Sequence, residues 1–167
     1  CGYNKCFQFG DISNNQSKNQ TPCVCPPIDS SLDVSSLLSY SCYGVHSVII
    51  DKNGRAYGIG YNEDFRISKT LPKERFKTEH EIFIKDPSNH PAKFLSAVCG
   101  WSYTLYLVSL QRERKEKLVI ASSNKAPFFL SINGLTSVKL FGGRTTAAAV
   151  DASGSIFIIS ESVLKTE

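Results

Sequence analysis

The sequence predicts an all-β fold built from repeated hairpins, and three observations support this prediction. Short runs of β-branched and aromatic residues end at polar turns, which is typical of strands. Turn sequences rich in Asp, Asn, Ser and Gly separate such runs at 51–54 and 151–154. The phrase GYNKCFQFG at 2–10 returns as GYNEDFRIS at 60–68. A phrase repeated along one chain favours a repeat architecture over a single amphipathic pattern.

Three segments follow one plan, in which a glycine precedes an apolar run, a polar turn and a second apolar run. These segments are 43–62, 99–124 and 141–160. The runs that we expect to be strands are 48–50, 105–108, 118–120 and 156–159. The alanines at 147–149 have poor strand propensity and are assigned to a strand only because the repeat requires it. The runs do not alternate with polar residues, so we expect sheets covered on both faces.

The spacing of the repeats predicts a propeller. Four short strands in roughly 40–60 residues are typical of one propeller blade. We therefore expect one domain, 1–167, that forms a partial β-propeller of about three blades, with repeats at roughly 1–62, 63–124 and 125–167. The hairpins are joined by long polar connections, which we expect on the surface where partners bind. These connections are 11–41, 63–92 and 125–136.

The repeated phrases resemble the regulator-of-chromosome-condensation repeat. That repeat combines a Gly-x-Asn segment ending in Gly-Gln-Leu-Gly, a Gly-x-x-His-Ser strand, an Asp-Gly turn and a Val-Tyr-x-Trp-Gly strand. The positions that match it, and that we expect to be structural, are Gly2, Asn4, Gly10, Gly44, His46, Gly54, Gly60, Asn62, Gly100, Asn124, Gly142 and Gly154. Phe7 and Phe65 stand where the family has a glycine, and Trp101 does not occupy the family's tryptophan position.

The resemblance implies a larger whole. The family closes seven blades, whereas this chain has material for about three. An open arc exposes strand edges and apolar blade faces. We therefore expect either that the polypeptide continues beyond Glu167 or that other chains cover the open ends. Some members of the family carry an adjoining BTB/POZ dimerisation domain, and the resemblance implies that one can follow here.

The composition argues against several classes of protein. Hydrophobic residues make up 41% and charged residues 20%, and the net charge of +4 does not by itself indicate nucleic acid. No apolar run reaches the ~18 residues of a membrane span. Six cysteines are too sparse for a disulfide-stapled secreted domain, and Cys42 and Cys99 lie in apolar segments where we expect buried, reduced thiols. We expect an intracellular protein, in the cytoplasm or on the cytoskeleton rather than in the nucleus.

The sequence contains no enzyme signature. His46 and Ser47 are adjacent on a strand, so their side chains point to opposite faces and cannot act together. We expect His46 to bind the backbone between blades and to be partly buried. The residues Cys23, Cys25, His80 and His90 lack zinc-site spacing. We therefore expect no catalysis, no metal and no cofactor.

Two basic stretches are candidate partner contacts. Between 69 and 77, lysines and an arginine surround two apolar residues, a mixture that suits a protein contact better than a nucleic acid. The mixed charges at 111–117 are typical of a solvated hairpin tip, although such a tip can also bind an acidic partner. The candidate contacts are Leu71, Lys73, Arg75, Phe76, Lys77, Arg112, Arg114, Lys115 and Lys117.

These observations predict a non-enzymatic protein-interaction module, acting as an adaptor or as a structural subunit of a larger assembly. The resemblance implies partners such as small GTPases, chromatin, cytoskeletal proteins or the ubiquitination machinery. The alternative is guanine-nucleotide exchange on a small GTPase, in which a loop is wedged into the nucleotide site and no catalytic triad is needed. We expect neither a membrane nor a nucleic acid as the partner.

Overall fold

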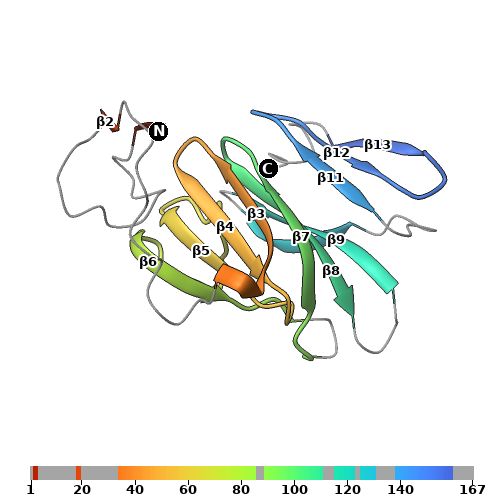
Figure 1. Cartoon of the computed structure of the whole chain (residues 1–167), viewed down its shortest axis with the longest axis horizontal. Coiled ribbons are helices and arrows are strands. Elements are labelled where there is room, and N and C mark those ends of the chain that lie inside the picture. Colours follow the sequence, from red (N-terminus) through yellow and green to blue (C-terminus); the bar gives the residue numbers. More distant parts are fainter. Residues whose placement is uncertain are drawn as a thin grey trace.

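The computed structural model describes residues 2–3, 18–19, 34–85, 89–110, 115–122, 125–130 and 138–159. This part of the chain forms three antiparallel sheets that lie side by side, together with a short pair formed by β1 (Gly2–Tyr3) and β2 (Lys18–Asn19) (Figure 1). Its helical residues form a single 3₁₀ turn, η1 (Val34–Ser36), and it holds no helix that could cross a membrane.

Each sheet is a meander in which strands adjacent in sequence are hydrogen-bonded neighbours. The first sheet consists of β3 (Leu37–Tyr43), β4 (His46–Asp51), β5 (Ala56–Tyr61) and β6 (Arg75–Ile82). The second consists of β7 (Lys93–Cys99), β8 (Tyr103–Leu110), β9 (Lys115–Ser122) and β10 (Lys125–Leu130). The third consists of β11 (Lys139–Gly142), β12 (Ala147–Val150) and β13 (Ile156–Ile159). The chain is therefore an all-β partial propeller, as predicted.

The two predicted tight turns are present and share one construction. The Gly54 N–H donates to the Asp51 carbonyl at 2.9 Å, and the Gly154 N–H donates to the Asp151 carbonyl at 3.0 Å. Both glycines have positive φ, which a side chain would strain. The Asp51 carboxylate also accepts bonds from the Arg55 backbone and guanidinium. These turns join β4 to β5 and β12 to β13.

The prediction that 63–92 and 125–136 are only connections is wrong, because each contains a strand. β6 lies in the first and β10 in the second, and β3 begins inside the segment 11–41. In β6 the buried side chains of Phe76 and Ile82 are separated by exposed or half-buried polar residues. Because of its charge, this outer strand resembles a surface loop in the sequence. The sheets, at 37–82, 93–130 and 139–159, are out of phase with the repeated phrases.

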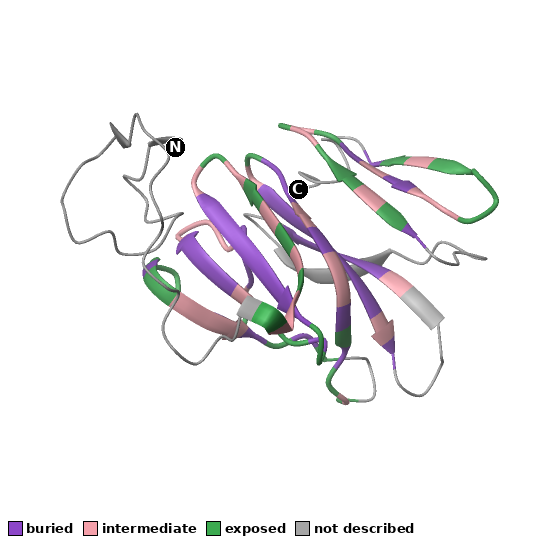
Figure 2. Cartoon of the chain, viewed as in Figure 1, coloured by how far each residue is buried: buried purple, intermediate pink, exposed green. Residues whose placement is uncertain are grey.

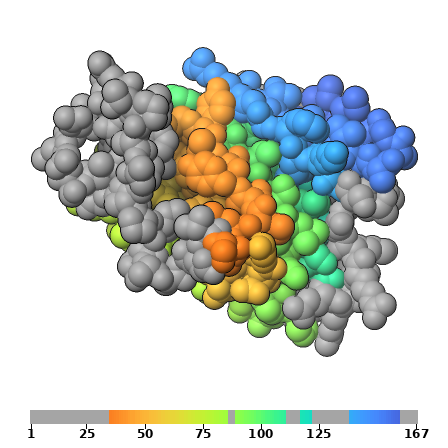
Figure 3. Space-filling model, in the orientation of Figure 1, coloured from red at the N-terminus to blue at the C-terminus, as the bar shows by residue number. Residues whose placement is uncertain are grey.

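The core lies between the sheets. From β8, Tyr106 and Val108 pack into a cluster with the first sheet, whereas Leu105 and Leu107 pack into a second cluster with the third sheet. The second sheet is therefore covered on both faces, as predicted (Figure 2). Each fully buried side chain of this size contributes about 1.5–3 kcal/mol. β7 contacts β3 and β11, so the first strands of the three sheets lie in a row (Figures 1 and 3).

The third sheet is an exception to the prediction of two covered faces. Ala147 and Ala149 are buried against the second sheet, where small side chains allow close packing. On the opposite face Phe141, Ile156 and Ile158 are 56%, 66% and 72% exposed. The prediction is wrong for this face, because the part of the chain that the structure describes places no sheet against it.

Candidate partner-binding face

Turns from all three sheets meet at one end of the propeller, which we call the turn face. It consists of the turns 44–45, 62–74, 100–102 and 143–146, which follow β3, β5, β7 and β11, together with the adjoining strand residues Tyr61 and Arg75. The register places Tyr43 opposite His46 and Tyr61 opposite Arg75 at this end. The turns 51–55 and 151–155 lie at the opposite end, as do the paired strand ends Leu110 of β8 and Lys115 of β9.

A buried chain of hydrogen bonds joins the first two sheets just below the turn face. The His46 ring Nε2 lies 2.9 Å from Thr104 Oγ1, and the Thr104 hydroxyl donates to the Arg66 carbonyl at 2.7 Å. Since the hydroxyl has a single proton, His46 Nε2–H must be the donor to Thr104. The expectation that His46 bridges blades is correct, but the ring is fully buried and its Nε2 bonds to a side chain.

Burial, followed by the charge of Arg66, lowers the pKa of His46 from 6.5 to about 3. The unfolded chain therefore binds a proton that the folded chain excludes, and stability is lost as the pH falls from 6.5 towards about 3. We expect the free energy of unfolding to be about 2 kcal/mol lower at pH 5 than at pH 8. Urea denaturation at a series of pH values measures this.

Carboxylates affect the stability only at lower pH, because the pKa of Asp51 is lowered from 3.8. Burial tends to raise that pKa, but hydrogen bonds from Arg55 outweigh this effect.

His46→Gln is the control, since it retains an N–H donor and removes the titration. The loss of stability between pH 8 and pH 5 should disappear in this variant. A wild-type urea midpoint that does not change over this range would contradict the assignment.

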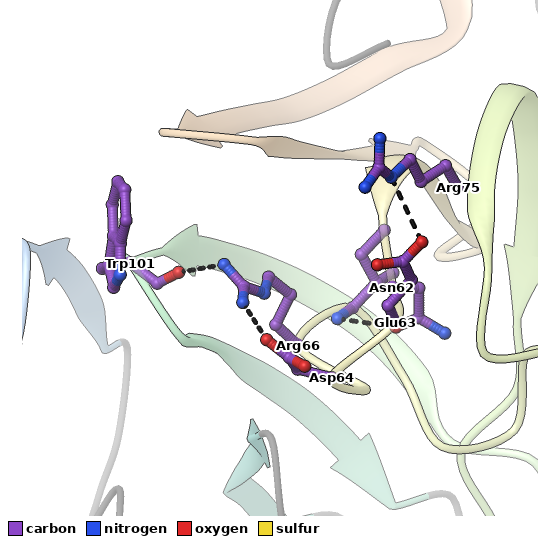
Figure 4. Close-up of polar contacts among 7 residues, drawn as sticks. Asn62, Glu63, Asp64, Arg66, Arg75 and Trp101 are labelled. Atoms are coloured by element: carbon purple, nitrogen blue, oxygen red, sulfur yellow. Dashed lines mark hydrogen bonds and ion pairs between the residues drawn. The ribbon is translucent and has the colours of Figure 1, made fainter. Parts of the chain in front are cut away.

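Trp101 connects the three sheets at the centre of the turn face. Its carbonyl accepts a 2.7 Å hydrogen bond from Arg66 Nη1 (Figure 4). Its N–H donates to the Arg144 carbonyl at 2.8 Å. Gly44 has a φ of 60° and lies so close that a Cβ there would be 3.2 Å from the ring. The backbone of Trp101 is thus fixed from both sides, while its side chain is 46% exposed.

The buried side chain of Asn62 organises the 62–74 loop. Its amide Nδ2 donates to the carbonyls of Ser68 and Pro72, at 2.9 and 2.8 Å. Its Oδ1 accepts from the backbone N–H groups of Ile67 and Ser68, both at 3.0 Å. One side chain therefore supplies the hydrogen-bond partners of four backbone groups in the loop. This holds Ile67 and Leu71 against the core.

Aromatic rings on the turn face are paired with cations. The guanidinium carbons of Arg66 and Arg75 lie 4.5 and 5.4 Å from the centre of the Tyr61 ring. Lys69 and Lys73 lie 5.8 and 5.5 Å from the centre of the Phe65 ring. Arg144 lies 5.4 Å from the centre of the Trp101 ring. Asp64 forms an ion pair with Arg66, and Glu63 forms one with Arg75 (Figure 4).

Phe65 has a φ of 57°, in the left-handed region. This conformation costs a residue with a side chain roughly 1–2 kcal/mol, and the repeat pattern that the sequence resembles has glycine here. The Phe65 N–H donates to the Asn62 carbonyl at 2.9 Å, which holds the turn. Strain of this kind is typical of functional sites.

The structure divides the predicted partner contacts. Leu71 and Phe76 are buried in the core, so the prediction that they are exposed anchors is wrong. Their neighbours Lys73, Arg75 and Lys77 are exposed, and Lys73 and Arg75 lie at the turn face. A role for these three in binding stays a prediction.

The other predicted contacts lie at the opposite end. Lys115 begins β9 opposite Leu110, and Lys117 follows it, so both lie near the end of the second sheet that is opposite to the turn face. Arg112 and Arg114 lie outside the described residues.

The predicted structural positions are found in turns and close contacts. Gly44, Gly54, Gly60 and Gly154 have positive φ. A Cβ on Gly100 would come within 1.9 Å of the Tyr103 ring. Gly142 lies close to the Cys99 carbonyl. Gly2 is in β1, whereas Asn4, Gly10 and Asn124 lie outside the described residues.

Cys99 is buried as predicted, and burial raises its pKa to about 12. Cys42 is exposed, so the prediction of burial is wrong for this residue, which lies on the outer face of β3.

Within the described ranges no three metal-ligating side chains are grouped. His80 stacks on Phe76, with ring centres 4.2 Å apart. Cys23 and Cys25 lie outside the described residues.

Sequence reasoning missed Trp101, Arg66 and Arg144 as members of the face. Their signal was present in part, because Phe65 and Arg66 depart from the repeat pattern at adjacent positions. Departures from a structural pattern are places where function can replace structure.

Comparison with known proteins supports the fold. No family model matches the sequence, and no curated protein matches it. Prp20p from Saccharomyces cerevisiae is 15% identical with a TM-score of 0.67, over 96% of this chain and 40% of its own. Human WBSCR16 is 15% identical with a TM-score of 0.67, over 94% of this chain and 40% of its own. Yeast RCC1 (Prp20) in its complex with Kap60 is 15% identical with a TM-score of 0.65, over 95% of this chain and 39% of its own. The chain has the fold of RCC1-like propellers and spans about two fifths of their length.

Proposed function

We propose that this chain is a non-enzymatic protein-interaction module that binds its partner on the turn face, as an adaptor or as a structural subunit of a larger assembly. The observation that carries the proposal is Trp101, whose side chain is exposed while its backbone is hydrogen-bonded to the sheets on both sides. Tryptophan and arginine dominate the energetics of protein interfaces, and a fixed anchor loses little entropy on binding.

The fold is compatible with this role. The study of Prp20p reports its binding to Gsp1p and histones, and RCC1 is observed bound to Kap60. We extend only the general capacity to this chain, namely that a propeller of this type presents its turns to protein partners. We place the protein inside the cell, in the cytoplasm or on the cytoskeleton, and propose that the whole protein completes the propeller or adjoins a BTB/POZ domain.

The alternative function is guanine-nucleotide exchange on a small GTPase. The likeness in fold to Prp20p, which binds Gsp1p, is the observation that favours it. A nucleotide-release assay with fluorescent GDP and a panel of small GTPases separates the two functions. Accelerated release would favour exchange, and binding without acceleration would favour the adaptor.

Replacing Trp101 tests the location of the interface. We expect Trp101→Ser to reduce partner recovery at least about tenfold, because truncation of a central tryptophan typically costs 2 kcal/mol or more. The two backbone bonds of Trp101 do not depend on its side chain, so the fold should persist. Pull-down from native source material, with crosslinking mass spectrometry, measures both recovery and location.

Phe83→Ser is the matched control, because Phe83 is 55% exposed and follows β6 at the opposite end. It should leave partner recovery unchanged. We expect crosslinks from Lys69 and Lys73 to converge on one protein. Crosslinks to that protein from Lys117 alone, with recovery unaffected by Trp101→Ser, would place the interface at the wrong end and refute the proposed location.

A further inference from the structure

We infer that the partner segment seated on the turn face is an acidic stretch of protein that also carries an aromatic or aliphatic side chain. This inference rests on the proposed function and names the chemistry of the partner. Two properties of the face carry it. One is an excess of cations that form no ion pair within the described ranges, and the other is the way in which those cations lie beside aromatic rings.

The charge on the face is unbalanced. The turn face carries five cations and three carboxylates. The cations are Arg66, Lys69, Lys73, Arg75 and Arg144, and the carboxylates are Glu63, Asp64 and Glu74. Two of the carboxylates are already bound to Arg66 and Arg75. Among the residues that the structure describes, no carboxylate forms an ion pair with the other three cations. These three are the groups left to bind an incoming anion.

Arg144 is the best placed of the three. Its backbone carbonyl is held by the Trp101 N–H, and its guanidinium lies beside the Trp101 ring. A guanidinium held in this way offers its planar fork to a carboxylate, which it binds with two parallel hydrogen bonds. The exposed Trp101 ring beside it supplies an apolar contact. A carboxylate next to an apolar side chain on the partner therefore matches this pair.

A protein segment fits better than a nucleic acid. Single strands bind by stacking bases on free aromatic faces along a continuous track of cations. Here a cation already lies beside each of the Tyr61, Phe65 and Trp101 rings. Glu63, Asp64 and Glu74 interrupt the continuous cationic track that a single strand would follow. Short carboxylate side chains can reach single cations between these acids.

The strain at Phe65 is explained by the same contact. Glycine would adopt the positive φ of Phe65 without cost, so the fold does not require this ring. The ring lies beneath Lys69 and Lys73, the two lysines of the face that form no ion pair with any residue the structure describes. It keeps both ammonium groups together on the loop. We therefore assign Phe65 to binding, where it positions the two lysines.

The test is selection of short random peptides on the immobilised full chain, followed by fluorescence anisotropy with the selected peptides. We expect the selected pool to be enriched in Asp and Glu with aromatic or aliphatic neighbours, and its affinity to fall as salt is raised. Arg144→Gln should weaken binding about tenfold, since one hydrogen bond between charged groups is of this order. Phe65→Gly should weaken binding at least about threefold and leave the urea midpoint nearly unchanged, because relief of the strain offsets the lost packing.

Lys85→Gln is the control for charge, because Lys85 is exposed at the opposite end. It should bind the peptides as the wild type does. Selected peptides that are neutral or basic, but that lose affinity in Trp101→Ser, would overturn this inference and leave the proposed function standing. Peptides whose binding no variant of the face affects would overturn both. Oligothymidylate or duplex DNA that displaces the selected peptides at lower concentration would also overturn the inference.

Discussion

Asn62→Ala is expected to lower the free energy of unfolding by about 3–5 kcal/mol. The Asn62 side chain is fully buried and makes four hydrogen bonds to the backbone of its own loop. Alanine removes all four and leaves buried N–H and carbonyl groups unpaired, each at a cost of about 1–3 kcal/mol. Whole domains are stable by only about 5–15 kcal/mol, so the loss approaches complete unfolding.

Urea denaturation and amide hydrogen exchange measure the effect of Asn62→Ala. The N–H groups of Ile67 and Ser68, which donate to Asn62 Oδ1, should lose their protection first. Asn53→Ala is the matched control, because Asn53 is exposed in the β4–β5 turn, and its cost should stay below about 1 kcal/mol. Similar midpoints for the two variants would show that the loop is held by packing and that the Asn62 bonds are dispensable.

The repeated phrase and the tight turns predict the fold because some of their residues have local roles. Asn62 folds its own loop, and Gly54 permits its own turn, so both roles depend on neighbours in sequence. The strands of the hairpins are predictable for the same reason, because runs such as 48–50 end at turns.

The candidate site is less predictable, because it is assembled from residues far apart in sequence. Trp101 acquires its role from Arg66 and Arg144, on the sheets at either side. No local pattern gives the packing of one blade on another. Phe65 is an intermediate case. Its departure from the repeat is visible in the sequence, but its positive φ and its contacts with two lysines are visible only in three dimensions.

β6 illustrates the same limit. Charged residues alternate with Phe76 and Ile82, a period of two that is typical of a half-buried strand. The high charge of the segment suggested a surface loop instead. Whether an apolar residue among charges is exposed depends on what packs against it. Here the first core cluster covers both Phe76 and Leu71.

Phe76→Ala is therefore expected to destabilise the protein by about 3–5 kcal/mol, the usual cost of removing a buried aromatic ring. The Phe76 side chain is 1% exposed and stacks on His80. Truncation leaves a cavity between β6 and the core. Because β6 is held to β5 by hydrogen bonds, it cannot move far enough to close this cavity. Thermal or urea unfolding measures the loss.

Phe83→Ala is the matched control, because Phe83 follows β6 directly and its side chain is largely exposed. It should cost less than about 1 kcal/mol. A Phe76→Ala protein as stable as the Phe83→Ala protein would mean that Phe76 is not a core residue, and would restore it as a partner contact. If Phe76→Ala unfolds as expected, its failure to bind a partner reports the loss of the fold. The interface must then be tested with Trp101, Phe65 and Arg144, whose side chains can be changed without removing the core.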